Sequence, residues 1–218
     1  MINHIKHLII KDLRIEWRQK HALGGALLYI LSTVFICYLA LQRLIDLRVW
    51  SALFWIIIVF VGIHTVSRSF IMENRKRYYY YQTLTSPGAF IMSKTGYNNV
   101  LMCVLSLLTY AAYTLFFRDL IQHQLLFLVT LVLGSMGLAS MLTMTSAIAW
   151  KAGNSLSLVA ILSFPLALPL LTLLIKLTKM AGGTFSTAEA LKFLLILLLL
   201  NIIINILSFI LFPFIWKD

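Results

Sequence analysis

The chain alternates between long apolar runs and short polar connections. Six of the runs are 19 to 26 residues long. An α-helix needs about 20 residues to cross the hydrocarbon core of a bilayer. The pattern therefore predicts an all-α integral membrane protein that forms a single membrane domain, with no sizeable soluble part. The predicted transmembrane segments are residues 22–42, 49–67, 97–117, 125–150, 156–177 and 193–216.

Residues 1–21 show a different pattern, because apolar side chains recur there at three- and four-residue spacing. This is the period of one helix face, and the basic residues fall largely off that face. Such a helix can lie on the membrane surface with its basic side chains among anionic headgroups. The pattern favours this interfacial helix over a short solvated one, because Trp17 is at the end nearest the first span.

The longest polar connection covers residues 68–96, between the second and third spans. Its first part, residues 68–83, contains no Gly or Pro, and the turn sequence Thr85-Ser86-Pro87-Gly88 follows. We therefore expect a partly helical loop. A loop of this length that joins two spans is a natural contact point for a soluble partner.

Composition supports the membrane assignment, since 61% of the residues are hydrophobic and only 11% are charged. Soluble domains contain about 25% charged residues. The formal net charge of +11 raises the question of nucleic-acid binding, but no nucleic-acid-binding motif accompanies it. The membrane explains the charge better, because Lys and Arg accumulate in cytoplasmic loops.

The positions of the basic residues also predict the topology. With the N-terminus in the cytoplasm, twelve Lys and Arg residues fall on the cytoplasmic side and six on the other. This bias favours cytoplasmic N- and C-termini and places the 68–96 loop in the cytoplasm.

The sequence offers little catalytic chemistry, since it lacks a nucleophile–base set, a metal-ligand cluster and a phosphate-binding loop. We expect a chain that is not an enzyme and does not hydrolyse ATP itself. His64 and His123 are the candidates for haem or metal contact, because imidazole ligates both. Both lie close to a predicted membrane interface, however, where a histidine needs no special role. Cys37 and Cys103 lie inside apolar runs and are expected to be small buried residues rather than a disulfide.

Two spans carry features that affect helix packing. Pro165 and Pro169 lie four residues apart in the fifth span, where each removes a backbone donor and kinks the helix. A hinge and a static kink filled by packing are both compatible with this pair. In the fourth span, Gly134 and Gly137 allow close helix approach, either to another span or to another subunit.

Four features of the chain resemble the CcmB family, haem exporter protein B, the permease subunit of the cytochrome c maturation ABC transporter. The segment 11–18 is similar to the family's amphipathic start, and the length and span count agree. The 68–96 loop has the family's acidic residue, Leu, Pro and closing Lys, although residues 76–80 depart from the usual Gly and acidic pattern. The fifth span is similar to the family's Pro-Leu-x-x-Pro-Leu-Leu core. The loop and core residues are Glu73, Leu84, Pro87, Lys94 and 165–171.

The resemblance implies a type-two ABC permease in a bacterial inner membrane, with haem as a transported or handled ligand. The implied partners are a soluble ATPase subunit, a second copy of the chain and other haem-handling membrane subunits. It leaves open whether the permease conducts haem or couples ATP hydrolysis to release of a haem-loaded chaperone. The loop suggests an ATPase-docking surface comprising Glu73, Arg75, Arg77, Tyr80 and Pro87.

Two other interpretations of the chain stay open at this point. The span count suits the permease of another type-two ABC exporter, for lipid, polysaccharide or drug, equally well. A membrane scaffold that assembles other subunits and transports nothing is the second alternative. An ATPase-dependent phenotype would argue against the scaffold.

Overall fold

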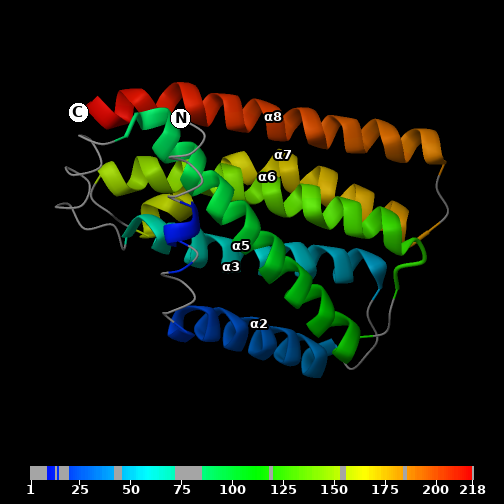
Figure 1. The fold of residues 1–218 in the computed structure, drawn as a ribbon. Coiled ribbons are helices and arrows are strands. Elements are labelled where there is room, and N and C mark those ends of the chain that lie inside the picture. Colours follow the sequence, from blue (N-terminus) through cyan, green and yellow to red (C-terminus); the bar gives the residue numbers. More distant parts are fainter. Residues whose placement is uncertain are drawn as a thin grey trace.

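The computed structural model describes residues 9–12, 14, 20–41, 46–71, 85–117, 120–152, 156–183 and 186–217. Within these ranges six helices are long and apolar enough to cross a membrane, which confirms the predicted all-α membrane fold. Successive helices run in opposite directions and form one elongated bundle (Figure 1). The helices are α2 (Lys20–Leu41), α3 (Leu47–Ile71), α5 (Pro87–Phe116), α6 (Gln124–Lys151), α7 (Leu156–Ala181) and α8 (Thr187–Lys217).

Helix α5 begins at Pro87 rather than at residue 97, so the end of the predicted 68–96 loop belongs to this helix. Ser86 precedes the helix with an extended backbone, and Pro87 is at its first position, where a missing N–H costs nothing. The stretch that follows is polar enough to lower its hydropathy, yet Lys94 and Asn98 are buried. The Lys94 ammonium and the Asn98 amide nitrogen have partners inside the bundle, which a hydropathy pattern cannot register.

Helix α6 is the centre of the bundle and packs against α3, α5, α7 and α8. In its span 61% of the residues are buried, against 11% in α2 and 17% in α8. Helices α2 and α8 therefore lie on the outside, and Figure 1 shows them on opposite sides of the bundle.

Aromatic side chains fill the interior between α3, α5 and α6. The rings of Trp50, Phe54 and Tyr113 have pairwise centroid distances of 5.2 Å, in stacked and edge-to-face arrangements that favour aromatic pairs. Trp55 donates its indole N–H to the Thr178 hydroxyl at 2.9 Å. This bond satisfies a buried donor and ties α3 to α7.

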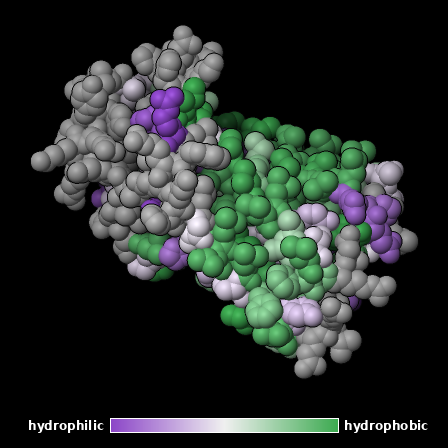
Figure 2. Space-filling model, turned by 60° about the horizontal axis from the view of Figure 1, so that its bottom comes forward, coloured by the Kyte–Doolittle hydropathy of each residue, from purple (hydrophilic) through white to green (hydrophobic). Residues whose placement is uncertain are grey.

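The outer surface is predominantly apolar. Figure 2 shows hydrophobic residues across the middle of the molecule and hydrophilic ones toward its two ends. Exposed side chains such as Leu28 and Ile36 on α2, and Leu195 and Ile203 on α8, contribute to this surface. An exposed apolar surface of this extent is unfavourable in water and is compatible with the acyl chains of a bilayer.

The two ends of the bundle differ in what they bring together. At one end Leu47 contacts Gly182, and the backbone N–H of His123 donates to the Ala181 carbonyl at 2.9 Å. At the other end Lys94 lies beside Asp12, and the rings of Phe90 and Trp216 pack with centroids 5.1 Å apart. We call these the His123 end and the Lys94 end. Asp12 and the end of α8 thus lie at the same end of the bundle.

Candidate functional site

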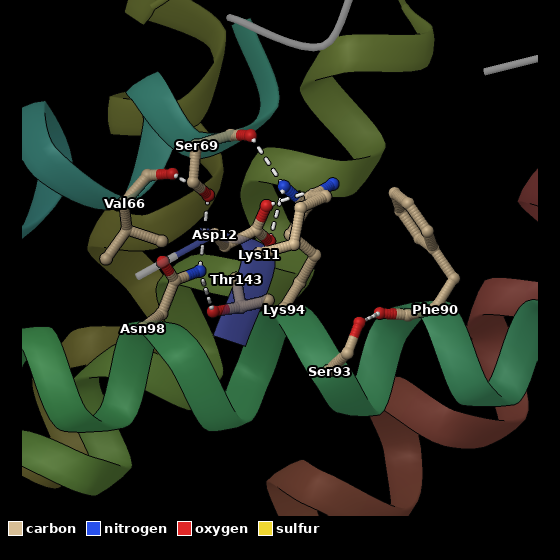
Figure 3. Close-up of polar contacts among 9 residues, drawn as sticks. All are labelled: Lys11, Asp12, Val66, Ser69, Phe90, Ser93, Lys94, Asn98 and Thr143. Carbon is tan, nitrogen blue, oxygen red and sulfur yellow. Dashed lines mark hydrogen bonds and ion pairs between the residues drawn. The ribbon is translucent and has the colours of Figure 1, made fainter. Parts of the chain in front are cut away.

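A buried ion pair lies at the Lys94 end. The Lys94 ammonium is 3.1 Å from Oδ2 of Asp12, and the two side chains are 4% and 8% exposed. The same ammonium donates to the Ser69 carbonyl oxygen at 3.2 Å. Lys94 therefore connects the N-terminal segment, the last turn of α3 and the first turns of α5 (Figure 3).

The polar contacts continue one turn along α5. The side-chain amide of Asn98 donates to the Thr143 hydroxyl at 2.9 Å and to the Ser69 hydroxyl at 3.3 Å. Ser69 in turn donates to the Val66 carbonyl at 2.7 Å. Asn98 and Thr143 are fully buried. We call the group Asp12, Ser69, Lys94, Asn98 and Thr143 the Lys94 cluster.

Each charge of the buried Asp12–Lys94 pair needs the other to compensate it. Removing one partner of a buried ion pair leaves an uncompensated charge and typically costs about 3–5 kcal/mol. Lys11 also lies 3.0 Å from the other Asp12 oxygen, Oδ1, but its side chain is more exposed. Together with the Ser69 carbonyl, the pair therefore joins three chain segments.

Sequence reasoning did not identify the Lys94 cluster. The sequence pattern places Asp12 only within the segment 11–18 and Lys94 only at the end of the 68–96 loop, and it predicts a membrane-surface helix for residues 1–21. Most of residues 1–19 lie outside the described part of the chain, but Ile9 packs against Gly96, where an added Cβ would lie 3.1 Å from its Cδ1 atom. The available signal was the placement of Lys94 and Asn98 one helical turn apart, just before a long apolar run, because intramembrane polar residues require partners.

The predicted docking residues lie mostly outside the described part of the chain. Glu73, Arg75, Arg77 and Tyr80 are not among the described residues. Pro87 is described and is the first residue of α5. The Lys94-to-Ser69 bond joins the two helix ends that flank residues 72–84, where the four undescribed docking residues lie.

The prolines of α7 lie on its outer face. Pro165 and Pro169 are exposed inside a continuous helix, while Ala167 and Leu170 are buried on the opposite face. Ser163, just before the first proline, contacts Thr145 of α6 through hydroxyls 2.9 Å apart. The proline-bearing segment is thus held to the central helix by a buried polar contact.

The structure does not bring the two candidate histidines together. His123 immediately precedes α6 at the His123 end, and His64 lies roughly 25 Å along α3 from Leu47, at about 1.5 Å per residue. Both side chains are exposed. Among the described residues no group of three or more His, Cys, Asp or Glu side chains could hold a metal ion.

The two glycines of α6 face other helices of the same chain. An added Cβ at Gly134 would meet Leu174 of α7 and lie 2.9 Å from Trp55 of α3. At Gly137 it would lie 2.7 Å from Oδ1 of Asn201 on α8. These positions let α6 approach three neighbouring helices closely.

Six membrane-length helices and a buried charged cluster at one end define a multi-pass membrane protein. The family model described as CcmB protein matches residues 3–214, so the chain belongs to this family. The family identifies it as a haem exporter permease component of cytochrome c maturation. Neither the curated proteins nor the solved structures gave a match.

Proposed function

We propose that this chain is the non-catalytic permease subunit of an ABC transporter that exports or delivers haem for c-type cytochrome maturation. A separate soluble subunit hydrolyses ATP. The family match over residues 3–214 is the observation that carries the proposal. The Lys94 end then faces the cytoplasm of a bacterial inner membrane, and both termini lie on that side.

The ATPase docks on residues 72–84 and neighbouring Pro87, with Glu73, Arg75, Arg77 and Tyr80 in contact. A permease without a nucleotide site must receive its motion from outside. This segment joins α3 directly to α5. Since Lys94 also bonds the last turn of α3, a push on the segment would move both helix ends together with Asp12.

Buried polar contacts provide a route for this motion across the bundle. Asn98 of α5 bonds Thr143 of α6 at 2.9 Å, and the Thr145 hydroxyl lies 2.9 Å from that of Ser163 on α7. The next residues of α7 lead to the hinge that we assign to Pro165 and Pro169. These contacts form a contiguous path from α5 through α6 to α7.

Haem is the handled ligand rather than a resident cofactor in this proposal. The distance between His64 and His123 along the bundle is far too large for both to ligate one iron. Each histidine would therefore act alone, at its own membrane interface. The complex also contains a second copy of this chain and other haem-handling membrane subunits.

Charge reversal tests the docking site. The Arg75→Glu/Arg77→Glu variant should insert normally and lose most of its yield in a pull-down of the ATPase, because like charges across an interface are costly. The matched control is Arg14→Glu/Lys151→Glu, which changes the charge equally at exposed positions of the Lys94 end. Wild-type ATPase yield from the correctly inserted Arg75/Arg77 variant would remove these arginines from the docking surface.

A further inference from the structure

An open groove runs between α5 and α8, with a volume of about 480 Å³. Its walls are largely apolar, and four polar side chains also line it: Thr95, Asn99, Asn205 and Ser208. On α8 the groove lies roughly 12–18 Å from the helix end at Lys217, at about 1.5 Å per residue. This depth puts its α8 wall well inside the apolar part of the bundle.

Ser208 is the least satisfied of these groups. Its side chain is 4% exposed, and its buried hydroxyl has no hydrogen-bond partner among the described residues. Asn205 is exposed, and within the described part of the chain its amide nitrogen bonds only the Asn201 carbonyl of its own helix, at 2.8 Å. In a membrane such groups are costly unless a neighbouring protein segment satisfies them.

We propose that this groove receives a membrane-spanning helix of a different subunit, one that presents Ser, Thr, Asn or Gln among small residues. Its polar side chain would bond the acceptor oxygen of the exposed Asn205 amide. Lipid acyl chains fit the apolar walls but offer no hydrogen-bonding group. A helix satisfies both the shape and the polar groups.

Shape argues against a second copy of this chain as the occupant. Two grooves facing each other across a two-fold axis would enclose a void rather than pack. Insertion of α2, the most exposed helix, would use the opposite side of the bundle from α8 (Figure 1). Such a contact would join different surfaces of the two copies, so it would continue from copy to copy and not close into a dimer.

The groove is a different surface from the ATPase-docking segment, so its occupant is tested independently of ATPase docking. A photoreactive amino acid is placed at Ile206, an exposed groove residue, in the full chain expressed with its native complex. The matched control is Ile203, which is exposed on the same helix but does not line the groove. Irradiation of intact membranes is followed by mass spectrometric mapping of the adducts.

We expect an adduct from position 206 that maps to a membrane-spanning segment of a different polypeptide containing such a polar residue. The adduct from position 203 should be much weaker. The Asn205→Leu variant should lower the 206 adduct about threefold at equal protein level, as expected for loss of one interhelical hydrogen bond. An adduct with a second copy, adducts with lipid alone, equal labelling at both positions, or an unchanged yield in the variant would overturn the proposal.

Cytochrome c maturation is measured in parallel to separate this inference from the proposed function. A specific 206 adduct in cells whose c-type cytochromes do not depend on this chain would leave the groove assignment intact and contradict the haem function.

Discussion

The carboxylate of Asp12 and the ammonium group of Lys94 lie 3.1 Å apart, and both side chains are more than nine-tenths buried. Two segments far apart in the sequence are joined by this contact. The Ser69 carbonyl adds the end of α3 to the junction. The contact therefore gives the N-terminal segment a fixed place on the bundle.

Breaking this pair from one side should destabilise the protein strongly. Asp12→Leu or Lys94→Met alone leaves one buried charge and should cost about 3–5 kcal/mol, whereas the double variant should recover most of the loss. Thermal unfolding in detergent measures the difference. The control Lys179→Met alters an exposed lysine of α7 and should shift stability by about 0.5 kcal/mol or less. A double variant no more stable than the singles would show that the pair does not act as a unit.

Glycine substitutions test the packing of α6. Gly134→Ala should destabilise the protein by about 1–3 kcal/mol, because the new methyl group would collide with Leu174 and Trp55. Gly24→Ala is the matched control, since nothing lies within 4 Å of its added Cβ. The unfolding temperature of the Gly134→Ala variant should therefore be lower than that of the Gly24→Ala variant. Equal stability of both would contradict the tight approach of α6 to α3 and α7.

Replacing Pro165 and Pro169 together by Ala should impair cytochrome c maturation without lowering the protein level. Both prolines are exposed, so their removal opens no internal cavity, and alanine favours helix by about 3 kcal/mol over proline. Leu168→Ala, at an exposed position on the same helix, is the control. Covalent haem staining and immunoblotting give the two readouts. Normal maturation at a normal level would exclude a hinge.

Reporter fusions test the topology predicted from the basic residues. A reporter that is active only in the cytoplasm should be active after Asp218 and silent when inserted at Asp119. Gly88 is unsuitable for insertion, because it is buried in α5 against Phe209. An active reporter at Asp119 would invert the proposed orientation.

The sequence predicted the helices better than their contacts. Long apolar runs identify spans directly, because a helix in lipid must satisfy its backbone internally and apolar side chains suit the surroundings. The same hydropathy reasoning placed the start of the third span at residue 97 and missed the turns containing Lys94. A buried lysine next to Asp12 is stable only through its partner, and sequence spacing does not reveal a partner so distant in the chain.

The sequence also did not reveal the neighbours of the glycine pair, the orientation of the proline pair, or the groove. The small residues at positions 134 and 137 indicated close packing, but only the fold identifies α3, α7 and α8 as the neighbours. The proline pair was visible as a motif, whereas its outward orientation depends on how α7 packs on α6. The groove between α5 and α8 is formed by side chains from two distant segments and has no signature along the chain.

The central claim is that this chain serves haem delivery to c-type cytochromes, and covalent haem in those cytochromes is its most direct measure. Cells lacking only this chain should contain no haem-stained c-type cytochromes, retain their b-type cytochromes, and recover when the wild-type chain is restored. Normal levels of covalent haem in the deletion strain would contradict the account.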